Sequence, residues 1–220
     1  MSDFPDISFK YFLAHSIALD IMKGFQKCIE TMVADCEMSG IRIKNNEDEI
    51  SNYLFKYYLN DDTVLHNMGL DNFYFERESP ENYTTNNPIG RADFRVINSN
   101  GFRPRKNYFL IECKRLDGDW NLNNEYIKEG ILRFNLPSLK YLTPTGFNGM
   151  AGYIVKSLNK EKNVGKINKL LAKYLDTCTE DFLVIIVGTE LYSSMHGLND
   201  SKTITLIHSF VDCSAVVSKS

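Results

Sequence analysis

Two short segments of the chain carry acidic and basic side chains that are suited to chemistry on a phosphate group. Asp93 ends the tetrapeptide GRAD, and Glu112 and Lys114 are the charged members of the tetrapeptide IECK. A hard cation such as Mg²⁺ binds through one or two carboxylates together with water and phosphate oxygens. Asp93 and Glu112 would supply those carboxylates, and the Lys114 ammonium would orient a water molecule or stabilise developing negative charge.

The surrounding residues predict two neighbouring strands that would position these groups. In residues 90–96 the apolar Ala92, Phe94 and Val96 alternate with charged residues, which places Asp93 on the polar face. In residues 108–114 the alternation puts Phe109, Ile111 and Cys113 on one face and Leu110, Glu112 and Lys114 on the other. A connection of about ten residues would let the two polar faces meet.

The pattern of Asp93 followed by Glu112-Cys113-Lys114 resembles the PD-(D/E)xK nuclease superfamily, which has the restriction-endonuclease-like fold. The resemblance covers roughly residues 45–139, and it departs from the literal pattern in that no proline precedes Asp93. It implies hydrolysis of phosphodiester bonds, with DNA as the expected substrate and Mg²⁺ or Mn²⁺ as the cofactor. It also implies that Asp93, Glu112 and Lys114 are catalytic, and that the backbone carbonyl of Cys113 is a third metal ligand beside the two carboxylates.

Glu49 is a further possible metal ligand, because many members of the superfamily bring a glutamate from the first core helix to the metal. The sequence offers a second interpretation, which we favour. Asn46 and Glu49 have the spacing of a capping box at the start of a helix, and a capping glutamate turns back toward its own backbone.

Basic residues near the two segments are candidates for contacts with nucleic-acid phosphates. Residues 1–90 hold 15 acidic and 7 basic side chains, whereas residues 91–220 hold 13 acidic and 18 basic ones, so the net charge of −3 conceals a basic C-terminal part. The candidates closest to the proposed metal site are Arg103, Arg105, Lys106 and Arg115. The lysines at 162, 166, 169 and 173 form a stripe that we interpret as the solvated face of a helix.

Composition excludes several classes of protein. With 43% hydrophobic residues the chain can build a sizeable core, and its longest apolar run, residues 182–187, is too short for a membrane span. We expect a cytoplasmic protein without membrane contact, since the first residues lack the pattern of a secretory signal. The five cysteines are widely spaced and lack a C-x-x-C pair, which predicts reduced thiols.

The periodic segments predict a mixed α/β protein around a partly antiparallel sheet, and the resemblance implies that this sheet is a restriction-endonuclease-like core flanked by helices. We expect one nuclease-like domain over residues 1–220, with a core at about 45–155, an N-terminal helix at 9–38 and a C-terminal α/β extension. Further helices are predicted after Asn46 and over 125–139 and 164–175. Strands are predicted over 73–78, 90–96, 108–114, 152–155, 182–188 (buried on both faces) and 203–211, and a loop over 79–89.

Two other functions remain open at this point. The chain would be a catalytically inactive nuclease-fold module that binds nucleic acid or a protein partner, or a scaffold in which the motif is only an ion-pair cluster. A homodimer is also compatible with the sequence.

Overall fold

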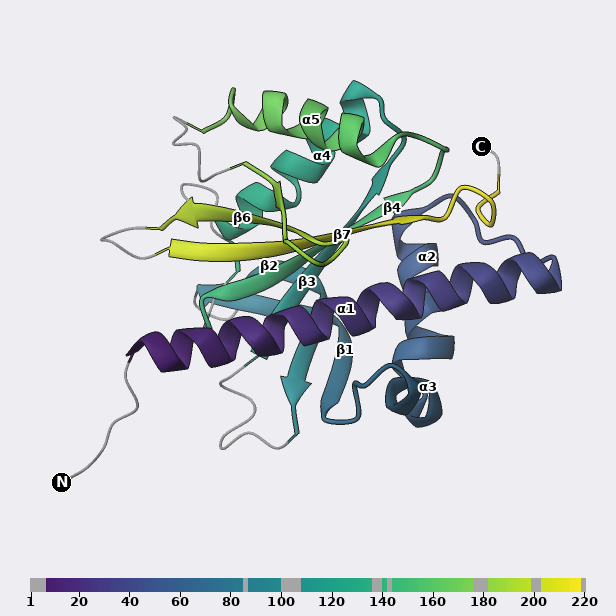
Figure 1. Cartoon of the computed structure of the whole chain (residues 1–220), viewed down its shortest axis with the longest axis horizontal. Helices are drawn as coiled ribbons and strands as arrows, with labels where there is room; N and C mark the ends of the chain where they lie inside the picture. Colours follow the sequence, from purple (N-terminus) through teal and green to yellow (C-terminus); the bar gives the residue numbers. More distant parts are fainter. Residues whose placement is uncertain are drawn as a thin grey trace.

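The computed structural model describes residues 7–84, 87–99, 108–135, 140–141, 144–175, 182–198 and 203–218. Seven strands within these ranges form one mixed sheet in the order β1-β2-β3-β4-β7-β6-β5. They are β1 (Phe73–Thr84), β2 (Asn87–Asn98), β3 (Tyr108–Leu116), β4 (Phe147–Ile154), β5 (Val184–Ile185), β6 (Tyr192–Gly197) and β7 (Thr203–Asp212). Helices cover both faces of the sheet, which gives three layers (Figure 1). The mixed α/β class with flanking helices is therefore confirmed.

The long helix α1 (Ile7–Ser39) covers one face of the sheet and confirms the helix predicted over 9–38. Its buried residues recur every three or four positions, at Ile21, Phe25, Ile29 and Met32. This spacing produces one apolar stripe, which packs against β4 and β7.

A second helical segment lies beside β3 and consists of α2 (Glu47–Leu54), the π-helical turn η1 (Phe55–Leu59) and α3 (Asp62–Asn67). Asn46 caps α2, because its side-chain oxygen accepts a hydrogen bond of 3.2 Å from the backbone N–H of Glu49. The predicted start of this helix is confirmed.

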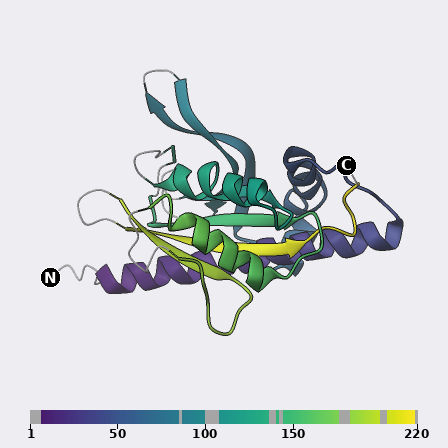
Figure 2. The same ribbon diagram turned by 90° about the horizontal axis from the view of Figure 1, so that it is seen from above.

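The strands β1 and β2 form a long antiparallel hairpin that projects from the body of the molecule (Figure 2). The loop expected over 79–89 is therefore wrong, because the pairing continues from Ser79 opposite Ala92 to Thr84 opposite Asn87. This polar segment lacks the apolar alternation from which strands are predicted. It still pairs, because backbone hydrogen bonds between strands do not require that alternation.

The strands β2 and β3 part at Asp93. Their ladder runs from Ile97 opposite Tyr108 to Phe94 opposite Ile111, and Asp93 is the next residue of β2. The expectation that Ala92 shares a face with Phe94 is wrong, because Phe94 is buried on the α1 side of the sheet and Ala92 on the other side. In β1, Glu78 lies between the partners of these two residues and has a φ of 50°, which interrupts the extended backbone.

The helices α4 (Trp120–Lys128) and α5 (Lys160–Leu171) cover the face of the sheet opposite α1, with the 3₁₀-helical turn η3 (Ile131–Phe134) beside α4. The single helix expected over 125–139 is wrong: α4 starts five residues earlier and ends before Gly130. A Cβ atom at Gly130 would lie 2.3 Å from the carbonyl oxygen of Tyr126 and 2.5 Å from the Met150 side chain, so the chain turns there against β4. Pro137, expected to end the helix, lies outside the described residues.

The remaining strands differ in length and burial from the predicted ones. The strand β4 is longer than the predicted 152–155, and α5 begins four residues before the predicted 164. The strand β5 lies at the edge of the sheet with Val184 and Ile185 58% and 52% exposed, so the expected fully buried strand over 182–188 is wrong. An edge position leaves such an apolar run partly in solvent. The predicted strand over 203–211 corresponds to β7, which lies between β4 and β6.

The strand β6 escaped the sequence analysis because two of its three buried side chains are polar. Ser194 and His196 are buried, and the Ser194 hydroxyl lies 2.8 Å from ring nitrogens of both His196 and His208. The Tyr126 hydroxyl lies 2.8 Å from the other ring nitrogen of His208. Burial holds the pKa of His208 well below its usual value, so this histidine is neutral and acts as a structural partner.

Two hydrophobic cores lie on either side of the sheet. Cys28, Cys36, Cys113 and Cys213 are buried and free, as expected for reduced thiols, and Cys178 lies outside the described residues. None of the helices in the described part of the chain combines the length and apolar character that crossing a bilayer requires.

Candidate functional site

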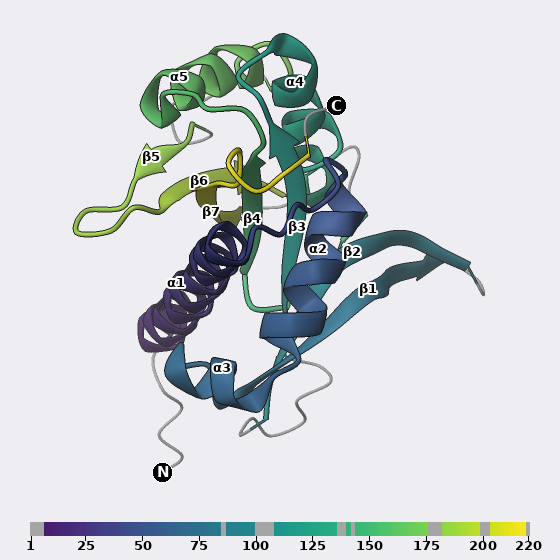
Figure 3. The ribbon, with the colours of Figure 1, turned by 90° about the vertical axis from the view of Figure 1, so that its right-hand side faces the viewer.

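The charged residues singled out in the sequence meet where β2 and β3 part. We use the name acid–lysine cluster for Glu47, Asp93, Glu112, Lys114 and the backbone carbonyl of Cys113. The cluster combines residues of α2, β2 and β3, and Figure 3 shows α2 in front of β3. The alternation predicted for β3 is confirmed, since Ile111 and Cys113 pack on the α1 side and Leu110 on the opposite side.

The ammonium group of Lys114 is the centre of the cluster. Its Nζ atom donates hydrogen bonds to Glu47 Oε1 at 2.6 Å, to Glu112 Oε1 at 2.9 Å and to the Cys113 carbonyl oxygen at 2.8 Å. Burial opposes the charge of Lys114, but the three neighbouring carboxylates, led by Glu112, outweigh it and raise its pKa above the usual value. Lys114 is therefore a buried, permanently charged cation surrounded by oxygen atoms.

The carboxylate of Glu112 is almost fully buried, with 1% of the residue exposed. Besides Lys114, it accepts hydrogen bonds from Arg133 Nη1 at 2.7 Å and from the Tyr141 hydroxyl at 2.8 Å. Burial and the nearby charge of Asp93 raise its pKa from 4.5 to about 7, against the opposing effect of the two cations. Such a shift is common in carboxyl groups at functional sites.

The carboxylate of Asp93 is held by the backbone of β3. Its Oδ2 atom accepts a hydrogen bond of 2.7 Å from the Cys113 N–H, and its Oδ1 atom lies 3.5 Å from Arg77 Nη1. Arg77 also donates to the Asp93 carbonyl oxygen at 2.9 Å. Because β2 leaves the ladder at this residue, the side chain fills the gap between the two strands, where its charge acts on both Glu112 and Lys114.

The first turn of α2 brings Glu47 to the cluster, whereas Glu49 is exposed. The glutamate of this helix that contacts Lys114 is thus Glu47, and not Glu49, which the sequence offered as a possible metal ligand. Side chains two positions apart on a helix point about 200° apart, so both cannot reach one point. Of the capping box, the structure shows the Asn46 half: Asn46 Oδ1 accepts a hydrogen bond from the Glu49 N–H, whereas the Asn46 N–H donates to the Lys44 carbonyl oxygen at 2.7 Å. The helix start was the signal that could have identified Glu47.

Arg133 and Tyr141 belong to the site, but the sequence analysis did not identify them. The Arg133 guanidinium connects Glu112 to the Tyr141 hydroxyl, at 2.9 Å, and to Glu129 Oε2, at 3.1 Å. The two residues lie 21 and 29 positions after Glu112 in a segment without a recognisable motif. Nothing in the local pattern connected them with the cluster.

Of the four basic residues proposed to contact nucleic acid, Arg115 lies within the described residues, and Arg103, Arg105 and Lys106 lie outside them. Arg115 Nη1 donates hydrogen bonds to the Asn45 carbonyl oxygen at 2.8 Å and to Asn45 Oδ1 at 3.1 Å. Arg115 thus contacts the segment that also presents Glu47 to the cluster.

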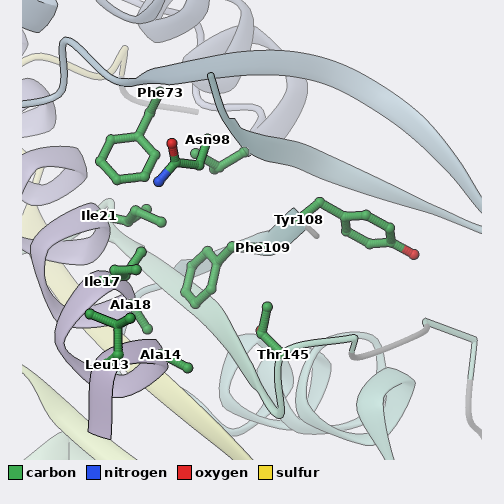
Figure 4. A pocket seen from close by; sticks show the side chains of 11 residues that line it. Leu13, Ala14, Ile17, Ala18, Ile21, Phe73, Asn98, Tyr108, Phe109 and Thr145 are labelled. Atoms are coloured by element: carbon green, nitrogen blue, oxygen red, sulfur yellow. The ribbon is translucent and has the colours of Figure 1, made fainter. Parts of the chain in front are cut away.

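Among the cavities formed by the described residues, two differ clearly in character. A polar cavity of about 710 Å³ includes Asn45 and Arg115 in its wall. An apolar cavity of about 280 Å³ lies between α1 and the sheet, where Ile17 and Ile21 face Phe73 and Phe109 (Figure 4). Neither cavity is lined by a residue of the acid–lysine cluster, but the wall of the polar cavity includes Arg115, which follows Lys114 in β3.

The oxygen atoms of the cluster suit a hard divalent cation. Carboxylates and a backbone carbonyl are the ligands that Mg²⁺ prefers, and Glu47, Glu112 and Cys113 already direct their oxygens at one cation, the Lys114 ammonium. Within the described ranges, no group of three or more His, Cys, Asp or Glu side chains is arranged to hold a metal. A metal bound here would therefore use at most two of the cluster's carboxylates together with the Cys113 carbonyl, and would keep several waters.

A comparison of the chain with protein-family models, curated proteins and solved structures finds no match. The functional argument therefore rests on the residues of the cluster and their surroundings.

Proposed function

We propose that this protein is a metal-dependent nuclease that hydrolyses phosphodiester bonds, with DNA as the expected substrate. The observation that carries the proposal is the convergence of Glu47, Glu112 and the Cys113 carbonyl on one buried cation, next to Asp93. Buried carboxylates whose charges perturb one another cluster at functional sites. The resemblance of the motif to PD-(D/E)xK nucleases and the mixed sheet with flanking helices agree with this proposal.

Four groups of the cluster have defined roles in the proposed reaction. Asp93, Glu112 and the Cys113 carbonyl would hold Mg²⁺ or Mn²⁺. When bound, such an ion lowers the pKa of a water molecule and neutralises charge on the scissile phosphate. The Lys114 ammonium orients the attacking water or stabilises the negative charge that develops on the phosphate.

The residues around the cluster position these groups. The Cys113 N–H fixes one oxygen of Asp93, and Arg133 with Tyr141 fixes the carboxylate of Glu112. A catalytic group that is held by its neighbours needs little rearrangement during the reaction. This preorganisation is the source of much of the rate acceleration in such sites.

The proposal is tested by a cleavage assay on plasmid, linear and single-stranded DNA and on RNA, with Mg²⁺ or Mn²⁺ against EDTA. Asp93→Ala, Glu112→Gln and Lys114→Ala should each reduce cleavage by roughly a hundredfold or more while the circular dichroism spectrum stays that of a folded protein. Glu125→Gln, which removes an exposed acid of α4, is the matched control and should cleave normally. Three folded variants with near-normal rates would remove the assignment of the site.

A second function is favoured by one specific observation. Glu47 and Glu112 contact the Lys114 ammonium, and Asp93 is held by Arg77 and a backbone N–H, so the carboxylates are compensated without a metal. The same arrangement would suit an inactive nuclease-fold module that binds nucleic acid or a protein partner. Lack of cleavage on all four substrates would support this module instead.

A further inference from the structure

The polar cavity lies beyond the carboxyl ends of three mutually parallel strands, and we call it the strand-end cavity. The strands β3, β4 and β7 run parallel and end at Leu116, Ile154 and Asp212. The cavity is lined by residues that follow or precede these ends, among them Arg115, Lys156 and Ser214. Crevices outside the carboxyl ends of parallel strands are common ligand sites in α/β proteins.

The cavity has the size and composition of a site for an anionic ligand. Its volume of about 710 Å³ falls within the range of ligand pockets. Arg115 and Lys156 contribute two positive charges to its wall, and hydroxyl groups come from Ser157, Ser214 and Ser218. Asp117 contributes one negative charge, so positive charge prevails in the lining.

The Arg115 side chain is held with part of its guanidinium available. Its Nη1 atom is occupied by both oxygens of Asn45, whereas its other two nitrogens have no hydrogen bond to any residue that the structure describes. A guanidinium anchored at one nitrogen offers the remaining N–H groups in a fixed orientation, which matches the oxygens of a phosphate.

The strand-end cavity and the acid–lysine cluster are linked through neighbouring residues of β3 and of the start of α2. Arg115 binds Asn45, and the preceding residue of β3, Lys114, binds Glu47, two residues after Asn45. In Figure 3 the segment that leads into α2 and the C-terminal segment after β7 lie together on this side. Hydrogen bonds from the Ile43 N–H to the Val216 carbonyl and from the Ser218 N–H to the Ile43 carbonyl join these segments.

We propose that the strand-end cavity binds a backbone phosphate of the nucleic-acid strand whose neighbouring phosphate reaches the acid–lysine cluster. The inference rests on the proposed function and gives the substrate a direction across the molecule. Arg115 and Lys156 contact the phosphate, and the hydroxyl groups of the cavity contact the same backbone. The contact is with the phosphate group, so it does not depend on base sequence.

The experiment measures binding without turnover. Fluorescein-labelled probes of about 20 nucleotides, as duplex DNA, single-stranded DNA and RNA, are titrated with the protein in EDTA. Fluorescence anisotropy is followed over a range of KCl concentrations. Replacing Arg115 and Lys156 together by alanine should weaken binding at least tenfold at low salt. The slope of log affinity against log salt should become shallower by about 1.8 on duplex DNA or about 1.4 on a single strand. Two phosphate contacts are lost, and fewer counterions are then released when the protein binds.

Three variants make the test specific. The double variant Lys162→Ala, Lys173→Ala removes two exposed charges outside the cavity lining and should leave the slope nearly unchanged. Lys156→Ala alone removes an exposed side chain, so the fold is retained, and it should give half of the slope change. Glu125→Gln, which removes an exposed acid of α4 outside the cavity lining, should bind as tightly as the unmodified protein.

The outcomes separate this inference from the proposed function. An unchanged slope in the Arg115 and Lys156 variants, an equal loss in the Lys162 and Lys173 control, or no binding of any probe would overturn the cavity as a phosphate site. If the protein binds ATP tightly but binds none of the nucleic-acid probes, the cavity is a site for a small phosphorylated ligand, and the inference of a nucleic-acid phosphate site is wrong. A protein that binds through the cavity but never cleaves would refute the nuclease alone.

Discussion

Lys114 shows how a single residue can both stabilise and restrict the acid–lysine cluster. Its ammonium occupies the point on which Glu47, Glu112 and the Cys113 carbonyl converge. An ammonium and a divalent cation compete for the same oxygens, because both are bound by negative and dipolar groups. Lys114 therefore has to withdraw from at least some of these contacts before a metal can use them.

Lys114→Met is expected to bind Mn²⁺ roughly tenfold more tightly than the unmodified protein, which corresponds to about 1.4 kcal/mol. The methionine fills similar space without competing for the oxygens, and it leaves Glu47 without its cationic partner, whereas Glu112 keeps Arg133. Isothermal titration calorimetry in the absence of nucleic acid measures the affinity. Lys162→Met, at an exposed position of α5, is the control. Unchanged or weaker Mn²⁺ binding by Lys114→Met would show that the ammonium does not stand at the metal position.

Glu112 makes stability depend on pH in the metal-free protein. Burial and Asp93 raise its pKa from 4.5 to about 7, so the folded protein binds this proton more tightly than the unfolded chain does. The stabilising contribution of the group is then complete below the unfolded pKa of 4.5 and is lost as the pH rises to about 7.

Glu112→Gln cannot ionise and should gain stability relative to the unmodified protein as the pH rises through this window. Urea denaturation in EDTA at several pH values between about 4.5 and 8 measures the difference in unfolding free energy. Glu125→Gln, which replaces an exposed acid, should show no such trend. A difference for Glu112→Gln that is constant with pH would contradict the raised pKa.

At the scale of elements, the register of α2 decides which glutamate meets the cluster. The N-cap Asn46 starts the helix at Glu47, and the rotation of about 200° over two residues carries Glu49 away from Lys114. The parting of β2 from β3 at Asp93 has a comparable effect, because it frees a strand residue to accept the Cys113 N–H instead of continuing the ladder.

Glu47→Gln is expected to lower the cleavage rate by about 10–100-fold, as is usual when a group that orients the reactive residues is lost. The effect should fall on kcat with little change in KM, because Glu47 positions Lys114 and does not hold the substrate. Glu49→Gln changes the same charge in the same helix turn and should cleave normally. Equal effects of the two substitutions would indicate that only the general charge of the helix start matters.

At the scale of the whole molecule, one seven-stranded sheet separates two cores that contain different helices. The core on the α1 side contains Ile29, and the core on the other side contains Ile167. Because β3, β4 and β7 contribute residues to both cores, neither core can lose its packing without disturbing the strands of the other.

Ile29→Val should therefore destabilise the whole protein by about 0.5–1.5 kcal/mol, and not only the α1 side. The single tryptophan, Trp120, starts α4 on the opposite face and reports on that side by its fluorescence. In each of the variants Ile29→Val and Ile167→Val, the urea midpoint should shift by the same amount whether unfolding is followed by Trp120 fluorescence or by circular dichroism. Two transitions that move independently would instead divide the molecule into separate folding units.

The sequence by itself determined the features that depend on neighbouring residues. The alternation in residues 108–114 predicted the faces of β3, the spacing in α1 predicted its apolar stripe, and Asn46 predicted the start of α2. The same local patterns identified Asp93, Glu112 and Lys114 as candidates for chemistry. Each of these inferences works because helices and strands repeat within a few residues, so a short segment contains the whole signal.

Only the tertiary structure decided which groups surround those candidates. Glu47, Arg133 and Tyr141 come from three separate segments, and their contacts with Lys114 or Glu112 depend on how those segments pack. The edge position of β5 and the polar interior of β6 were equally hidden, because a strand's place in a sheet is set by its pairing partners. Contacts between distant segments leave no local period in the sequence, and this is why the candidate chemistry could be predicted while its environment could not.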